Sequence, residues 1–137
     1  MAKSIFLSIK PEYTKKIELR EKLYELRNFN TKYDIERFYI YESSPKSQLT
    51  YIAYVDTPVC YPDSISNYGP EAVRFNSGES KYKKAYPIKH LYKLKKPLKL
   101  KELKDSFGFS APQAYVYSDT YELLELEINK SEKIKIF

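Results

Sequence analysis

The sequence predicts an α+β fold: a small mixed β-barrel with one helix after the first strand and short peripheral helices. Short strand patterns recur along the chain, one helical pattern follows the first strand, and no regular strand–helix repeat is present. These features exclude a doubly wound parallel sheet. The 137 residues suit one domain that buries about two thirds of its unfolded surface. A barrel of this size is filled by side chains, so we expect any site at its mouth or in a surface cleft.

A helix interrupts the strand patterns near the N-terminus. A β-rich run over residues 5–9 stops at Lys10-Pro11, and proline is favoured in the first turn of a helix. We therefore expect a helix over residues 12–19, with Tyr13 and Ile17 on its buried face because their spacing matches one helical turn. Three further strands are predicted, at residues 23–29, 37–43 and 49–55.

The middle of the chain contains an irregular segment followed by a lysine-rich strand. Turn residues and prolines dominate residues 61–81, so we expect a loop there with a short helix near 70–75. The strand at 88–95 is predicted to bury one face, which includes His90, and to carry lysines on its outer side. His90 is accordingly expected to be a buried, hydrogen-bonded histidine and not a catalytic one.

The C-terminal part of the chain gives weaker signals. We expect one or two helical turns over 100–107 and a last strand at 113–117. Residues 119–122 resemble a capping box, which would start a helix over 123–128. Polar and apolar residues also alternate in that segment, so a strand is nearly as well supported.

Composition excludes several classes of protein. No run of about 20 apolar residues is present and the N-terminal segment lacks a signal-peptide pattern, so we expect a soluble, cytoplasmic protein. A single cysteine, Cys60, and a single histidine cannot form a Cys/His zinc site. The three glycines are too far apart for a glycine-rich phosphate loop. We expect no metal, no cofactor and no membrane, and Cys60 is expected to be a structural thiol.

Positive charge is concentrated in one segment. The formal net charge is +6, and residues 81–104 contain ten lysines but one acid, Glu102. Such a basic stretch is typical of a protein that binds a polyanion, because each neutralised phosphate releases counterions. The alternative is a solvated strand edge whose lysines discourage pairing with other sheets.

Several segments together resemble the ASCH domain family. The opening match consists of residues 7–13 (LSIKPEY), 16–17 (KI) and 21–27 (EKLYELR). Later matches in the same order are 39–45 (YIYESSP), 86–89 (YPIK), 96–98 (KPL) and 111–115 (APQAY). The resemblance implies a PUA-like barrel over residues 1–117, and we expect residues 118–137 to be a C-terminal extension packed on the same domain. Arg20 stands where the family has glycine, so we expect a less left-handed backbone there.

The motif Lys22-x-x-Glu25-x-Arg27 is the strongest candidate for a site. On a strand, Glu25 and Arg27 share one face, and Lys22 is close enough to reach it. The carboxylate would then orient two cations, and arginine fits a phosphate or a guanine edge. An ordinary cross-strand salt bridge is the alternative interpretation.

The resemblance implies a basic cleft that binds RNA. Aromatic rings after the Pro112-Gln113 turn border this cleft in the family, so they are candidates for stacking on bases, and Gln113 for reading a base edge. The predicted nucleic-acid-binding residues are Lys10, Lys22, Arg27, Ser43, Ser44, Lys46, Lys89, Gln113, Tyr115 and Tyr117.

Three classes of function remain open. The first is a noncatalytic module that binds nucleic acid, with RNA preferred over DNA. The second is a metal-independent hydrolase of RNA or a modified nucleoside, since some similar proteins are ribonucleases or acetylated-cytidine amidohydrolases. In the amidohydrolases a threonine stands where this chain has Glu25, and a carboxylate cannot act as a hydroxyl nucleophile. If this chain is an enzyme, Glu25 would instead act as a general base for water while Lys22 polarises a carbonyl. The third is an interaction or counter-defence protein of a phage or mobile element, with a protein partner.

Overall fold

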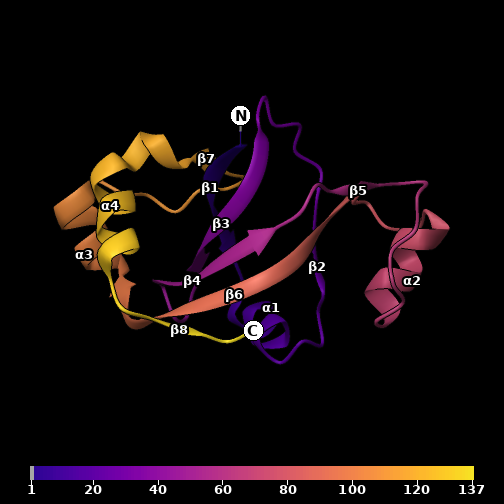
Figure 1. The fold of residues 1–137 in the computed structure, drawn as a ribbon, viewed down its shortest axis with the longest axis horizontal. Helices are drawn as coiled ribbons and strands as arrows, with labels where there is room; N and C mark the ends of the chain where they lie inside the picture. The colour runs from indigo at the N-terminus through magenta and orange to yellow at the C-terminus, as the bar shows by residue number, and fades with distance from the viewer. Residues whose placement is uncertain (1) are drawn as a thin grey trace.

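The computed structural model describes residues 2–137 and shows one mixed sheet with helices at both ends (Figure 1). The strands are β1 (Ala2–Ile9), β2 (Tyr24–Arg27), β3 (Asp34–Glu42), β4 (Gln48–Val55), β5 (Val59–Cys60), β6 (Lys84–Lys99), β7 (Val116–Tyr117) and β8 (Lys133–Lys135). The helices are α1 (Pro11–Glu18), α2 (Pro70–Ser77), α3 (Leu100–Phe107), η1 (Ser118–Tyr121) and α4 (Glu122–Lys130). The predicted α+β class is confirmed. Residues 123–128, for which the sequence supported a helix or a strand, belong to helix α4.

The sheet runs in the order β2-β6-β4-β3-β1-β7, while β5 and β8 pair with β6. Strand β1 is parallel to β3, and α1 forms part of the connection between them. Core residues lie on both faces of the sheet: one cluster includes Leu7, Phe38 and Leu91, and the other includes Phe6, Ile52 and Leu94. The sheet is therefore buried in part on both sides, which explains why its strands are largely apolar.

Helix α1 begins at Pro11, as its sequence predicts, but it buries a different face. Ile17 is buried, whereas Tyr13 is 39% exposed, so the expectation for Tyr13 was wrong. Thr14 is buried in its place because its hydroxyl donates to the buried Glu42 carboxylate at 2.6 Å. This hydrogen bond fixes the rotation of α1 and leaves Tyr13 facing a cleft.

The turn after α1 is left-handed despite the absence of glycine. Arg20 has φ of 61°, so the expectation of a less left-handed backbone was wrong. The guanidinium of Arg20 lies over the ring of Phe137, 4.4 Å from its centroid. This cation–π contact offsets part of the conformational cost of a left-handed arginine.

Irregular pairing in β6 changes which residues its faces present. Tyr54 pairs with His90 but Val55 pairs with Ile88, so one extra residue lies between these two positions of β6. A bulge of this kind reverses the alternation of side chains. Ile88 therefore packs on the first cluster, while His90 is exposed on the opposite face. The prediction that His90 is buried was wrong.

The segment between β5 and β6 carries α2 and lies at the end of the molecule opposite α3 and α4 (Figure 1). A third core cluster, which includes Leu26, Ile65 and Phe75, holds this segment against β2. Asn76 supports it by bonding to both the N–H and the carbonyl of Ile65. The segment is thus packed on the domain although its sequence reads as a loop.

The C-terminal residues contact the sheet at two places. Leu124 and Ile128 of α4 are buried in the second cluster, and β8 pairs with β6 from Tyr92 to Leu94. Across residues 2–137, no helix is long and apolar enough to cross a membrane.

Candidate functional site

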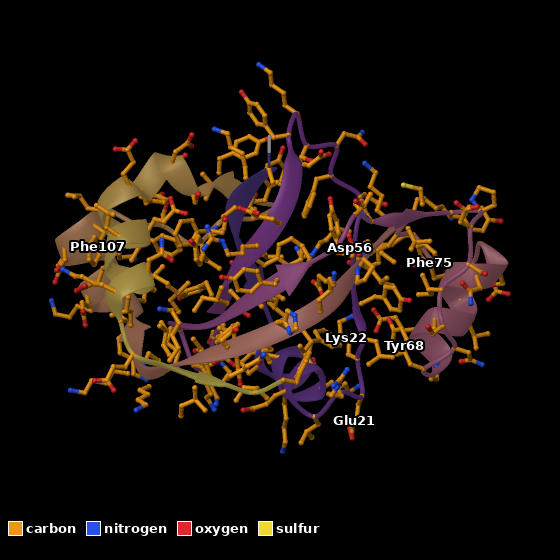
Figure 2. All side chains as sticks on the ribbon, viewed as in Figure 1. Glu21, Lys22, Asp56, Tyr68, Phe75 and Phe107 are labelled. Carbon is orange, nitrogen blue, oxygen red and sulfur yellow. The ribbon has the colours of Figure 1, made fainter. Side chains whose placement is uncertain are left out.

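A cleft of about 930 Å³ lies between the end of β1, α1, β2 and the α2 segment. Figure 2 shows Lys22 and Tyr68 in this region, between β2 and α2. Four charged residues lie on its floor and are called the floor cluster: Lys22, Glu25, Arg27 and Glu71.

Ion pairs connect all members of the floor cluster. Lys22 Nζ lies 2.6 Å from Glu71 Oε1 and 3.6 Å from Glu25 Oε1. The other Glu25 oxygen, Oε2, accepts from Arg27 Nε at 2.9 Å and lies 2.7 Å from Arg27 Nη2. Arg27 also donates to the Ser8 carbonyl at 2.9 Å, which ties the cluster to β1. Both oxygens of Glu25 are therefore engaged with cations.

Local structure explains why these charges meet. Strand β2 pairs with β6, with Glu25 opposite Tyr86 and Arg27 opposite Lys84, so the two β2 side chains share one face. Glu71 lies in the first turn of α2, where a carboxylate is stabilised by the helix dipole. Lys22 is only 5% exposed, so its two carboxylate partners take the place of the water that its amine loses on burial. The structure thus brings the three predicted motif residues together and adds Glu71, which the sequence did not indicate.

Tyr68 is a second cleft residue that sequence reasoning missed. Its ring stacks on Tyr24, with centroids 5.9 Å apart and planes 17° apart. The Tyr68 hydroxyl is buried and has no hydrogen-bond partner among residues 2–137. Burial, together with the nearby carboxylates of Glu71 and Glu25, raises the pKa of Tyr68, so this hydroxyl stays protonated. It is therefore a donor without an acceptor beside the floor cluster.

The rim of the cleft carries exposed cations. Four of them make no ion pair within the described part of the chain: Lys10, Lys16, Arg74 and Lys81. Two acids, Glu21 and Glu79, also line the cleft, so its charge is mixed with an excess of cations. The rings of Tyr13 and Tyr82 supply apolar surface between these charges.

The predicted residues of the 43–46 turn are not among the residues that line the cleft. The Ser43 N–H donates to the Ile9 carbonyl at 3.1 Å, so the turn is held close to Lys10. Ser44 and Lys46 are exposed. Lys89 is likewise outside the cleft lining, and its amine lies 3.8 Å from the Asp56 carboxylate.

The predicted aromatic residues near the C-terminal strand pack against other rings. The ring centroids of Tyr115 and Phe29 lie 4.7 Å apart, and the Tyr117 hydroxyl accepts from the Lys32 backbone N–H at 2.9 Å. Neither lines the cleft, and Gln113 is exposed outside it. The adjacent turn does approach the cleft, because the Ser8 hydroxyl donates to the Pro112 carbonyl at 2.9 Å.

The lysine-rich segment does not form one surface around the cleft. Of its ten lysines, Lys81 is the one that lines the cleft. Several others pair with separate acids on different elements: Lys89 with Asp56, Lys93 with Glu18, Lys95 with Glu132 and Lys101 with Asp105. The other cations of the cleft lie on α1, β2 and α2 or directly beside α1 and β2: Lys10, Lys16, Lys22, Arg27 and Arg74.

Residues 2–137 contain no group of three or more His, Cys, Asp or Glu side chains arranged to hold a metal ion. Cys60 is a free, exposed thiol on β5.

Comparison with solved structures identifies the fold. The chain is similar to an ASCH protein from Zymomonas mobilis, with a TM-score of 0.69 and 20% identity over 95% of this chain and 96% of that one. Two variants of the Zymomonas protein, a serine-to-alanine and a tyrosine-to-phenylalanine change, give TM-scores of 0.68 and 0.71 at the same identity. No family model and no curated protein matches the sequence. The chain therefore has the fold of these ASCH structures, as the sequence segments predicted.

Proposed function

We propose that this protein is a module that binds single-stranded RNA by taking one nucleotide into the cleft. The observation that carries the proposal is the floor cluster, which holds charged donors and acceptors at the base of a cleft with aromatic walls. A volume of about 930 Å³ is in the range of sites for small ligands and cofactors.

Polar groups at the floor suit the edge of a base. The second oxygen of Glu71, Oε2, has no partner within residues 2–137, and the Tyr68 hydroxyl has none either. An acceptor and a donor without partners therefore line the same cleft, the combination that pairs with an exocyclic amine and an adjacent ring nitrogen. Because the Tyr68 oxygen is buried, we expect the α2 segment to shift slightly when a base enters.

Cations at the rim suit the phosphates on either side of that base. Lys16, Arg74 and Lys81 are exposed, so binding a phosphate requires little desolvation and does not break an existing ion pair. The rings of Tyr13 and Tyr82 can stack on a base regardless of its identity. RNA is preferred over DNA because the resemblance of the sequence segments to the ASCH family implies an RNA-binding module.

The test is a binding titration with a labelled single-stranded RNA of about 12 nucleotides, followed by fluorescence anisotropy. Affinity should fall steeply between about 50 and 200 mM salt, and Arg74→Ala should reduce the dependence of log K on log salt by about 0.7. Lys101→Ala is the matched control, because Lys101 is 88% exposed and far in sequence from the cleft residues. Equal effects of the two substitutions, or a flat salt response, would reject the cleft as the binding site.

A hydrolase is the second candidate, and the accessibility of Glu71 favours it. Glu71 is 31% exposed and contacts Lys22, so it can act as a general base on water while Lys22 polarises a carbonyl or phosphoryl oxygen. Glu25 suits this role less well, because both of its oxygens are engaged. The test is single-turnover cleavage of RNA and deacylation of acetylated cytidine, in which Glu71→Gln should abolish any turnover while Glu25→Gln should not.

A further inference from the structure

A second surface of the sheet carries cations and aromatic rings, away from the cleft. Arg37 lies on the same face of β3 as Tyr39, and Tyr54 lies on the same face of β4 as Ile52. Helices α3 and α4 cover the part of this face that holds the second core cluster. The rest is open: Tyr54 is 37% exposed and the Arg37 side chain 24%. The open part is called the Arg37 face and consists of Arg37, Tyr54, His90, Tyr92, Lys133 and Lys135.

Arg37 is held in a fixed position among tyrosine rings. Its Nε donates to the Ser4 hydroxyl at 3.0 Å, and its guanidinium carbon lies 5.7 Å from the ring centroids of both Tyr39 and Tyr54. Its one ion-pair partner within residues 2–137 is Glu36, 3.9 Å away and 51% exposed, while the Glu125 carboxylate accepts from the neighbouring Tyr39 hydroxyl at 2.9 Å. Arg37 is therefore held in place by a hydrogen bond and two rings, and its one ion-pair contact is long.

Lys133 places a second cation on the Arg37 face, because it pairs in register with Leu94 of the second core cluster. Its amine donates to the carbonyls of Asn129 and Ser131, and it has no carboxylate partner among the described ion pairs of residues 2–137. Burial, and then the charge of Arg37, lower the pKa of Lys133. Two cations that repel each other across a half-buried surface form a site that an anion would stabilise.

The neighbouring rings extend this site across the sheet. The rings of Tyr54 and Tyr92 lie 5.7 Å apart at 68°, and Tyr92 is paired in register with Lys135. His90 pairs with Tyr54 and is exposed. Half-exposed rings beside cations on an open sheet are the combination that binds bases and phosphates of a single strand.

We propose that the Arg37 face is a second binding surface for single-stranded nucleic acid, in which Arg37 and Lys133 bind a phosphate and Tyr54 or Tyr92 stacks on a base. It is separate from the cleft: Ser4, which contacts Arg37, is near the start of β1, whereas Ser8, which contacts Arg27, is near its end. An anionic membrane is the other polyanion to consider, but the partly exposed rings of Tyr54 and Tyr92 favour bases, on which they can stack.

The absence of tryptophan from the sequence provides the test. The variant Tyr54→Trp introduces a single fluorophore on the Arg37 face, which is titrated with oligouridylate of about 12 nucleotides at about 50 mM salt. We expect the nucleic acid to quench its emission. In that background, Lys133→Gln should weaken binding roughly three- to ten-fold and lower the salt dependence by about 0.7, while Lys101→Gln should leave both unchanged. Arg37→Gln should also weaken binding, and Arg37→Lys, which keeps the charge, should retain more of it; equal losses in the two variants would point to unfolding, which circular dichroism would show.

Two further titrations separate this proposal from the cleft and from membranes. Quenching at Tyr54→Trp should persist when Arg74→Ala weakens the cleft, so the proposal can survive if the cleft does not bind RNA. The proposal is overturned if the oligonucleotide binds without quenching, if quenching disappears with Arg74→Ala, or if phosphatidylglycerol vesicles quench and oligouridylate does not.

Discussion

Replacement of Lys22 by methionine tests the energetics of the floor cluster. Methionine preserves most of the packing of the lysine stem but removes the charge, so both ion pairs of Lys22 are lost. Glu25 keeps its contacts with Arg27 at 2.7 and 2.9 Å, and Glu71, which is 31% exposed, can regain water. Breaking a buried ion pair costs about 3–5 kcal/mol. Because both carboxylates keep or regain other partners, we expect the free energy of unfolding to fall by about 3 kcal/mol, the lower end of that range.

The assay is urea unfolding followed by circular dichroism. A loss of about 3 kcal/mol corresponds to a decrease of about 10 °C in Tm for a domain of this size. Lys101→Met is the control: Lys101 is 88% exposed and pairs with Asp105 at 2.7 Å, and loss of such a surface pair should cost less than about 1 kcal/mol. If Lys22→Met is no more destabilising than this control, the ion pairs of Lys22 do not stabilise the floor of the cleft.

The Tyr68 hydroxyl, the Glu25 carboxylate and two buried tyrosines each allow a further test. Tyr68→Phe should raise the free energy of unfolding by about 1 kcal/mol, because it removes a buried hydroxyl without a partner, and it should weaken RNA binding; a destabilised variant would show that the hydroxyl is hydrogen-bonded. Glu25→Gln should keep or increase affinity for RNA in the anisotropy assay, since a negative charge facing the ligand is removed, and a large loss would contradict this role. At high pH, burial raises the pKa values of Tyr39 and Tyr86 to about 12. Their contribution to stability is therefore complete below about pH 10 and lost as the pH rises to about 12, which unfolding measured from pH 9 to 12 with tyrosine absorbance would check.

The sequence predicted the local parts of the site well. Pro11 marked the start of α1, and the spacing of Glu25 and Arg27 on a strand placed both side chains on one face. These features depend on backbone periodicity over a few residues, which a sequence shows directly.

Residues from the α2 segment could not be predicted in the same way. Glu71 contacts Lys22 across 49 residues of sequence, and this contact depends on how Phe75 and Ile65 pack against Leu26. The acidic first turn of α2 reads as an ordinary helix start. The one available signal was an aromatic residue and an acid flanking Gly69-Pro70, which marks where the chain turns into the helix.

His90 shows a different limit of sequence patterns. Regular alternation assigned it to the buried face, but the extra residue in β6 between Ile88 and His90 reversed the faces. The same irregularity leaves His90 exposed and opposite Tyr54 on the Arg37 face.

Photo-crosslinking locates the RNA on the protein and so tests whether a nucleotide enters the cleft. An RNA of about 12 nucleotides containing 4-thiouridine is bound, irradiated, and the crosslinked peptides are located by mass spectrometry. Entry of one nucleotide into the cleft predicts crosslinks at Tyr13, Tyr68 or Tyr82, whether or not others form on the Arg37 face. These cleft crosslinks should decrease with Arg74→Ala and not with Lys101→Ala. Crosslinks confined to residues outside the cleft would contradict the proposed function.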